Sequence, residues 1–356
     1  MPKTRTRLTR PKKPKKSTSK SKECADPSGP TEREWESMKV FRTFVVKDDE
    51  KKQYQFMTGK TAFILPTDVE PGTEADDCDF WIGKIKDIRA RGDDPSEVWV
   101  RVQWYWSPEE VAEKVRSFDA TKCSKYERLL SNSYDFVHSS CFDGLIDVMK
   151  YDEQDLEQRP IRPESFFYRY TYDCHKGIIK PSAEGKCICN KPYDPVEDEF
   201  MHMCVRKGCR KWYHRDCLLK RNWVATPLAG SSHMRAQLFE KTLPDDSPEI
   251  PTIKLSRGHP GKDGLQNSDL SYSDIPKELL TLARSPIARG AGMESVVGNA
   301  ASVIEARRIV CAATRADNPE LVPEYWKERV SISGLSASRR IIEDVNLLCP
   351  ECGGPV

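Results

Sequence analysis

Four pairs of metal-ligand residues constrain this chain more than any other feature of its sequence. The pairs are Cys187-x-Cys189, Cys204-x4-Cys209, His214-x2-Cys217 and Cys349-x2-Cys352. Short gaps let a tight turn supply two ligands to one tetrahedral ion, and these eight residues make two complete four-ligand sites. Because neither site keeps an open position for water, the pattern predicts two structural Zn²⁺ ions rather than a catalytic metal. The alternative is a set of ordinary buried cysteines with one stray histidine.

The thirteen cysteines are expected to be reduced. No hydrophobic segment follows the basic N-terminus, so the sequence shows no signal peptide. No apolar stretch approaches the roughly 20 residues that a membrane span needs. We therefore expect thiols and metal ligands instead of a disulfide framework, and no membrane partner.

The first residues carry most of the charge asymmetry. Residues 1–22 contain ten Lys or Arg and no acid, whereas the formal net charge of the whole chain is only +2. Such a segment cannot bury enough apolar surface to order itself, so residues 1–37 are predicted to be a disordered basic arm and linker. The arm suits nuclear import or non-specific contact with DNA, and a merely solubilising tail is the alternative.

Residues 38–175 have the texture of a β-rich domain. Short runs of β-branched and aromatic residues predict strands at 41–46, 61–65, 80–88, 98–106, 141–151 and 166–172. A helix is expected at 107–115, which Ser107 and Pro108 introduce. Many short strands with few helices indicate a mainly β, barrel-like domain with α insertions.

A long insertion separates the last cysteine pair from the other ligands. The metal-binding module is predicted to begin at 180–225 and to be completed at 345–356, so the insertion covers 226–344. Residues 225–275 are rich in Pro, Gly, Ser and Asp and are expected to be flexible, while 276–315 and 319–330 favour helix. The insertion must leave and return at nearly the same place, which is tolerable because loop-closure entropy grows slowly with length.

Three tryptophans form the second informative group. Alternation along strand 98–106 places Trp104 and Trp106 on one face, and Trp81 can lie beside them on a neighbouring strand. Three indole rings around one hollow attract a quaternary ammonium group. The same alternation is also expected of a hydrophobic core that contains three tryptophans, and this alternative stays open.

Residues 40–172 resemble a BAH domain. The segments that carry the resemblance are ILP (64–66), FWIGKIKDI (80–88), VRVQWYWSPEE (100–110) and ERLLSNSYD (127–135). The similarity is to BAH–PHD proteins of the fungal polycomb-effector type and the plant flowering repressors. It implies that Trp81, Trp104 and Trp106 form a cage for trimethylated lysine 27 of histone H3. It also implies that Glu110 and Asp135 contact the histone.

Residues 187–217 resemble a PHD finger, since Trp212 and Tyr213 directly precede the ligand His214 in CRKWYHRDC. The resemblance implies interleaved ligation in a two-zinc cross-brace. One zinc would then be held by Cys187, Cys189, His214 and Cys217, and the other by Cys204, Cys209, Cys349 and Cys352. Zinc is worth roughly 10–16 kcal/mol to the folding of such small domains.

The finger also offers a possible second cage. The resemblance implies that Tyr193, Met201 and Trp212 surround methylated lysine 4 of histone H3, and that the strand near 200–203 pairs with the histone tail. Simple packing of a small core is the alternative for these three residues.

The sequence shows no sign of an enzyme. It lacks a Gly-rich phosphate loop, a G-x-S-x-G elbow and an H-E-x-x-H motif. The resemblance to BAH–PHD proteins implies a nuclear chromatin reader in polycomb-type repression, with the histone H3 tail and nucleosome as partners. We also expect a co-repressor at the insertion. Two alternatives stay open: a RING-like ubiquitin ligase, because RING fingers share the eight-ligand topology, and a chromatin scaffold with no open cage.

Overall fold

The structure is a computed structural model in two compact units. It describes residues 29–47, 53–66, 76–92, 97–181, 187–198, 200–206, 209–224, 275–293, 295–313, 320–330, 347–354 and 356. The first unit comprises Met1–Lys150 with Glu164–Ser182, and the second Tyr151–Pro163 with Ala183–Val356. Within these ranges, no helix combines the length and apolar character that crossing a membrane requires. The basic arm at 1–22 and the segment 225–274 lie outside the described residues.

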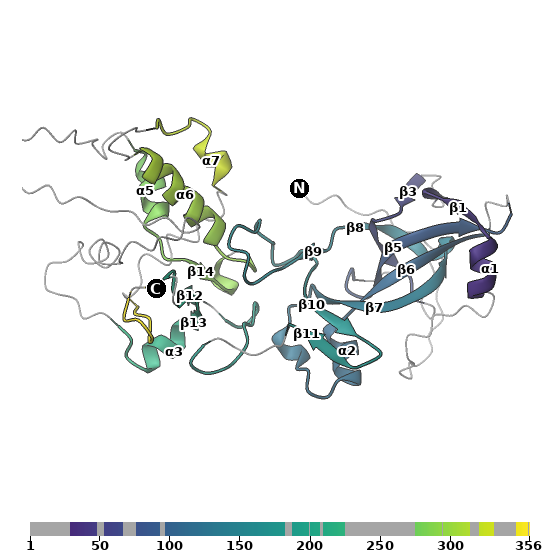
Figure 1. The fold of residues 1–356 in the computed structure, drawn as a ribbon, viewed down its shortest axis with the longest axis horizontal. Helices are drawn as coiled ribbons and strands as arrows, with labels where there is room; N and C mark the ends of the chain where they lie inside the picture. Colours follow the sequence, from purple (N-terminus) through teal and green to yellow (C-terminus); the bar gives the residue numbers. More distant parts are fainter. Residues whose placement is uncertain are drawn as a thin grey trace, which may run out of the picture. The chain divides into compact units, whose positions relative to one another are not determined.

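The first unit is built on one large, mostly antiparallel sheet (Figure 1). Its strand order is β11-β10-β7-β6-β5-β4-β8, β1 also pairs with β5, β9 with β10, and β2 and β3 form a separate hairpin. The strands are β1 (Lys39–Phe41), β2 (Thr43–Lys47), β3 (Gln53–Met57), β4 (Thr61–Ile64), β5 (Trp81–Ala90), β6 (Val98–Trp106), β7 (Glu127–His138), β8 (Phe142–Ile146), β9 (Met149–Lys150), β10 (Phe167–Asp173) and β11 (Ile178–Lys180). The prediction of a mainly β fold with α insertions is confirmed.

Most predicted strands lie where the runs of β-branched and aromatic residues placed them. Four of them correspond to β4, β5, β6 and β10, and the predicted helix corresponds to α2 (Pro108–Lys114). Ser107 caps α2, because its side chain accepts a hydrogen bond from the Glu110 backbone while the Glu110 carboxylate accepts one from the Ser107 backbone. Short 3₁₀ turns occur at Ala120–Lys122 and Ser139–Cys141.

Strand β7 is the longest strand of the described chain, and no strand was predicted there from the sequence. Its sequence is too polar for an alternation rule, but its polar groups find partners inside the sheet. Glu127 and Arg169 form a fully buried ion pair at 2.6 Å, and the Ser131 hydroxyl donates to the Trp104 carbonyl at 2.9 Å. Pairing on both edges, to β6 and β10, then makes β7 central to the sheet.

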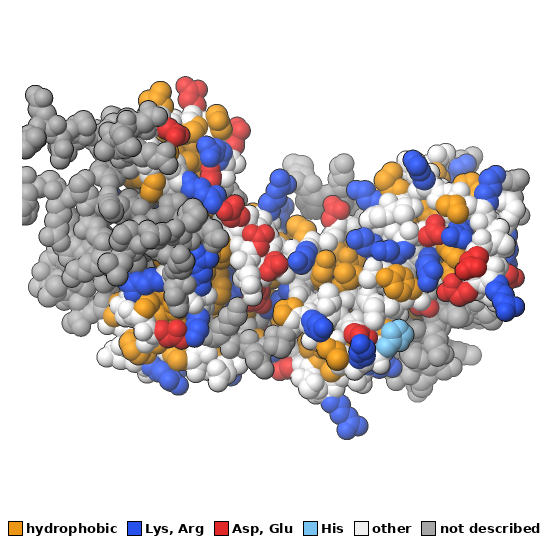
Figure 2. All heavy atoms as spheres, in the orientation of Figure 1, with side chains coloured by type: hydrophobic (Ala, Val, Ile, Leu, Met, Phe, Trp, Pro, Cys, Tyr) orange, Lys and Arg blue, Asp and Glu red, His pale blue; other side chains and the backbone are white. Residues whose placement is uncertain are grey.

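The prediction that residues 1–37 are a disordered arm and linker is wrong for the last six residues of that range. Glu32–Ser37 forms helix α1, which starts at a capping box between Thr31 and Glu34. The helix buries Trp35, which is 2% exposed and lies 4.5 Å from the Phe136 ring, between ring centroids. Arg89 also stacks on Trp35, with its guanidinium carbon 5.0 Å from the ring centroid. Acidic and basic side chains lie side by side on the surface near α1 (Figure 2), where Glu32 pairs with Arg101 at 3.6 Å.

The second unit combines a three-stranded sheet with short helices. Its sheet has the order β13-β12-β14, and an isolated bridge joins Val224 to Leu347. The elements are β12 (Met201–Met203), β13 (Trp212–His214), α3 (Arg215–Lys220), α5 (Lys277–Ala283), β14 (Ala288–Arg289), a 3₁₀ turn (Ala291–Met293), α6 (Ala300–Ala313) and α7 (Trp326–Arg329).

The helical prediction for the insertion holds only in part. Helices α5, α6 and α7 confirm it, but the described residues of 285–299 contain no α-helix and instead form β14 and a short 3₁₀ turn at Ala291–Met293. The cause is local: Pro286 ends the helical pattern, and Gly290 and Gly298 adopt positive φ angles of 137° and 85°. At Gly298 a Cβ atom would lie 2.1 Å from the Ala288 carbonyl oxygen, so only glycine lets the chain pass there.

We predict that helix α1 is part of the folded first unit. Replacing Trp35 with Ala should lower the free energy of unfolding by about 3–5 kcal/mol, because it leaves a cavity against Phe136 and Trp99. Denaturant unfolding followed by circular dichroism measures this loss. The matched control, Glu36→Ala on the exposed face of α1, should change stability by less than about 0.5 kcal/mol. Equal stability of the two variants would contradict the assignment.

Candidate functional site

The eight ligand-type residues come together in two groups of four. Within each group the candidate ligand atoms all lie within 4.8 Å of one another. The first group is Cys187, Cys189, His214 and Cys217, and the second is Cys204, Cys209, Cys349 and Cys352. Ligands about 2.3 Å from a tetrahedral ion lie about 3.8 Å apart, so both groups fit around one ion each. The two clusters can therefore hold metal ions.

In the first cluster the imidazole is oriented by a carboxylate. The His214 Nδ1 atom lies 3.2 Å from Cys189 Sγ and 3.9 Å from Cys217 Sγ, so Nδ1 is the nitrogen that faces the cluster. The opposite nitrogen, Nε2, lies 3.1 Å from Asp198 Oδ2. A carboxylate in this position fixes the tautomer and the ring orientation of a ligand histidine. Asp198 lies sixteen residues before His214 in the chain and belongs to no recognisable motif. The sequence therefore offered no sign that it contacts His214.

In the second cluster the thiols of two distant segments meet. Cys204 Sγ lies 3.4 Å from Cys352 Sγ, and Cys209 Sγ lies 3.5 Å from Cys349 Sγ. These distances exceed the roughly 2.05 Å of a disulfide by far, so the cysteines are free. The Tyr213 hydroxyl lies between Cys209 and Cys349, 3.5 and 3.6 Å from their sulfur atoms.

The thiols of the clusters differ in their pKa values. Burial raises the pKa of three of them, those of Cys204, Cys209 and Cys217. Although burial also opposes ionisation of Cys187, hydrogen bonds from His214 lower the pKa of that thiol to about 6. Burial likewise opposes ionisation of Cys349, yet backbone N–H groups and the Tyr213 hydroxyl lower its pKa to about 7. Since the thiolate is the metal-binding form, each cluster has one residue that is readily ionised.

The two ends of the insertion are joined by a short stretch of backbone pairing. Besides the Val224–Leu347 bridge, the Leu348 N–H donates to the Trp223 carbonyl at 2.9 Å. The Cys349 N–H donates to the Gly354 carbonyl at 2.7 Å in the turn that presents the last two thiols. We call residues 187–224 together with 347–356 the Cys/His module.

The three tryptophans of the predicted cage belong to one hydrophobic cluster of the first unit. Trp81 begins β5 and is half-buried, whereas Trp104 and Trp106 on β6 are 1% and 8% exposed. The rings of Trp81 and Trp104 meet at 78° with centroids 5.7 Å apart. Gly83 lies opposite Trp104 across the strand pair, and a Cβ atom there would be 3.5 Å from the Trp104 ring. Trp106 packs at 75° against Tyr172, with centroids 5.6 Å apart.

The two predicted histone-contact residues have internal partners. Asp135 on β7 accepts a 2.6 Å hydrogen bond from the indole N–H of Trp104. Glu110 is held by Ser107, whose backbone N–H and hydroxyl both donate to its carboxylate at 2.9 Å. Asp135 is therefore joined to the tryptophan group, while Glu110 stabilises the start of α2.

A surface hollow of about 220 Å³ lies beside β7, and Asp135, which binds the Trp104 indole, is one of its lining residues. Arg101, Tyr134 and Phe136 line it, and alternation points their side chains away from the face that carries Trp104. Arg101 stacks over both rings, 5.5 Å from Tyr134 and 5.8 Å from Phe136. This hollow therefore adjoins the tryptophan group through Asp135.

The structure brings together Tyr193, Met201 and Trp212, the possible second cage. They are 3%, 2% and 5% exposed, and they surround the guanidinium of Arg289, a residue of the insertion. The implied pairing of the strand near 200–203 with a histone tail finds no open edge in the structure. Both edges of β12 are paired, one with β13 and the other with β14.

We predict that the Cys/His module loses one metal ion when the last cysteine pair is broken. Cys349→Ser should reduce the bound metal from about two ions per chain to about one, because it removes a ligand of the second cluster only. Elemental analysis of the purified full chain measures this content. Cys311→Ser, on α6 and outside both clusters, is the control and should keep both ions. Retention of both ions by Cys349→Ser would contradict the assignment.

We further predict that Asp198→Asn weakens one site selectively. Loss of the carboxylate behind His214 should lower metal affinity at the first cluster by about 10- to 100-fold. Competition with a graded series of chelators resolves the two sites. An equal loss at both clusters, or none at either, would show that Asp198 does not position the ligand.

Comparison with known proteins identifies the first unit. A family model described as the BAH domain matches residues 44–182. Chromatin remodeling protein SHL of Arabidopsis thaliana is 28% identical over 158 residues, which cover 44% of this chain and 62% of that protein. Chromatin remodeling protein EBS of the same plant is 27% identical over 139 residues, which cover 39% of this chain and 55% of that protein. The matches thus span less than two thirds of either relative.

A solved structure, the yeast Rsc2 BAH domain, aligns with a TM-score of 0.28 and 14% identity over 40% of this chain and 54% of that chain. A score this low carries no weight, so the assignment depends on the family match and on the sequence relatives. Residues 44–182 of this chain belong to the BAH domain family.

Proposed function

We propose that this chain is a non-enzymatic chromatin reader that acts in the nucleus in transcriptional repression of the polycomb type. Its BAH domain would bind the tail of histone H3 trimethylated at lysine 27. The observation that carries the proposal is the perpendicular pair of Trp81 and Trp104, with Asp135 bound to the Trp104 indole, inside a BAH domain. The similarity to two chromatin remodeling proteins supports the cellular setting.

The chemistry of this group suits a methylated lysine. The Trp81 and Trp104 rings meet edge to face, so a cation would reach both ring faces only after Trp81 moves aside; each contact is then worth roughly 0.5–2 kcal/mol. A trimethylammonium group donates no hydrogen bond, so ring faces are its natural partners. The Asp135 carboxylate adds negative charge at the Trp104 nitrogen and so strengthens the attraction. Trp81 is the most exposed of the three rings, so the methylated side chain would enter by displacing Trp81.

We propose that the Cys/His module is a PHD-type finger with two structural Zn²⁺ ions. Seven thiols and one imidazole form the donor set that zinc prefers, and each cluster is complete with four protein ligands. The metal would stabilise the fold of the module and would take no part in catalysis. The remaining partners stay part of the proposal: the nucleosome, DNA at the basic arm and a co-repressor at the insertion.

Isothermal titration of the full chain tests the proposed reading of histone H3. Histone H3 peptides that include lysine 27, unmodified and trimethylated, should bind with clearly different affinities. Trp81→Leu keeps apolar bulk but removes one ring face, so it should weaken binding of the trimethylated peptide by about 2- to 30-fold. Asp135→Asn should weaken it in the same direction.

The matched control is Trp99→Leu, a buried tryptophan of the same strand as Trp104 that packs on Trp35 instead. It should lower stability and leave the discrimination between the two peptides intact. Equal affinity of the wild-type chain for both peptides would contradict methyl-lysine reading and favour a chromatin scaffold whose tryptophans form only a core.

A further inference from the structure

Arg289 of the insertion occupies the aromatic site of the Cys/His module. Its guanidinium carbon lies 4.0 Å from the Tyr193 ring centroid and 4.4 Å from the Trp212 ring centroid. Its Nη2 atom lies 3.8 Å from the Met201 sulfur. The Arg289 side chain is 3% exposed, so its guanidinium contacts two aromatic rings and a thioether in place of solvent water. The three residues that the sequence grouped as a cage therefore enclose a cation of the chain itself.

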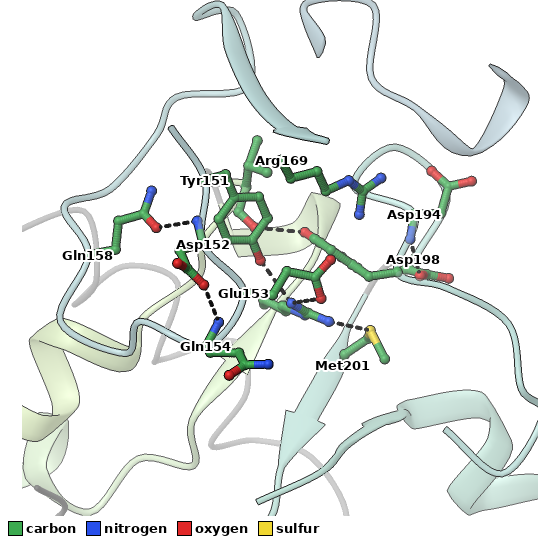
Figure 3. A network of polar contacts seen from close by, with 12 residues as sticks. Tyr151, Asp152, Glu153, Gln154, Gln158, Arg169, Asp194, Asp198 and Met201 are labelled. Carbon is green, nitrogen blue, oxygen red and sulfur yellow. Dashed lines mark hydrogen bonds and ion pairs between the residues drawn. The ribbon is translucent and has the colours of Figure 1, made fainter. Parts of the chain in front are cut away.

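Polar groups complete this site, and one of them, Tyr151, also contacts the Tyr193 ring edge to face. Arg289 Nη1 donates to the Tyr151 hydroxyl at 2.8 Å and pairs with the Glu153 carboxylate at 2.9 Å. Figure 3 shows Tyr151, Glu153 and Met201 converging on this one guanidinium. Burial disfavours the charge, but the neighbouring Tyr151 and Glu153 raise the pKa of Arg289 above its ordinary value. The guanidinium is therefore a buried cation with a carboxylate partner.

The backbone around Arg289 is held as firmly as its side chain. In β14, Arg289 lies opposite Met201 and Ala288 opposite His202 of β12. The Met203 N–H donates to the Ile287 carbonyl at 2.9 Å, which extends the pairing. The Asn299 side chain also holds β14, since it accepts from the Ala288 N–H at 2.8 Å. An extended strand with one anchored side chain is the form in which a peptide ligand adds to a sheet edge.

We propose that the Cys/His module contains an arginine-binding site, with β14 and Arg289 of the insertion as its internal ligand. The strand fills the β12 edge, and the guanidinium fills the space between Tyr193 and Trp212. The module is then closed to an external peptide as long as β14 stays in place. This inference goes beyond the proposed reading of histone H3 by the BAH domain, since it concerns residues of the second unit alone.

The donors and acceptors of the site favour guanidinium over a methylated ammonium group. Tyr151 and Glu153 each receive an N–H from Arg289, and a trimethylammonium group has none to offer. A methylated lysine would leave both acceptors without these bonds, which costs binding energy. The ring faces attract either cation, so the hydrogen bonds decide the preference.

Rescue of an Arg289→Ala variant by methylguanidinium tests the proposal. The full chain is loaded with its metal ions, and the midpoint of metal release on heating is measured as methylguanidinium is added in the millimolar range. The variant should release its metal at a lower temperature than the wild type. Methylguanidinium should raise the midpoint of the variant saturably, because it refills the vacated site. The wild type should not respond, since Arg289 fills its site.

Tetramethylammonium is the matched probe and should bind the variant at least about tenfold more weakly. If Arg289→Ala does not fold, methylguanidinium present while the chain refolds with metal should restore the metal content. Three results would each overturn the proposal: no rescue by methylguanidinium, an equal response of the wild type, or equally tight binding of tetramethylammonium.

Discussion

The bridge between Val224 and Leu347 is the constraint on which the second unit depends. It returns the chain after the long insertion and places Cys349 and Cys352 beside Cys204 and Cys209, so that four thiols from two distant segments share one cluster. The entropic cost of so long a connection is modest, because each doubling of loop length adds only about 0.6 kcal/mol. The cluster is also connected to strand β13, because the Tyr213 hydroxyl contacts the sulfur atoms of Cys209 and Cys349.

The insertion packs against the Cys/His module and completes it. It supplies the third strand of the sheet and the cation that fills the aromatic site, so that the two ring faces and the Glu153 carboxylate meet a charge of the chain itself. A site filled in this way is unsuited to read a histone tail. The BAH domain, in which Trp81 and Trp104 stand near a right angle beside Asp135, is therefore the part of the chain to which we assign recognition of chromatin. The two aromatic groups thus have different chemistry. In the BAH domain, Trp104 donates a hydrogen bond to the Asp135 carboxylate. In the Cys/His module, the rings of Tyr193 and Trp212 contact the Arg289 guanidinium.

Local patterns predicted most elements, and long-range pairing determined the rest. Runs of β-branched and aromatic residues located β5 and β6, and the ligand spacing identified the eight cluster residues that the structure brings together. The capping box at Thr31 and Glu34 was visible in the sequence as T-x-x-E and was overlooked because the surrounding segment is polar. Strand β7 was missed because Glu127 and Ser131 look like surface residues until their partners Arg169 and Trp104 are known. No local pattern connects Arg289 to Tyr193 or Asp198 to His214, since only the tertiary fold brings these residues into contact.

One measurement tests the division between the two aromatic groups most directly. The eight tryptophans give eight indole N–H signals in a nitrogen-15 NMR spectrum of the full chain, which can be assigned by single substitutions. On addition of the histone H3 peptide trimethylated at lysine 27, the signals of Trp81 and Trp104 should shift, because the cation would lie against their rings. The signal of Trp212 should stay in place, because Arg289 already occupies its ring face. A shift of Trp212 with unchanged Trp81 and Trp104 would contradict the account and assign recognition to the Cys/His module.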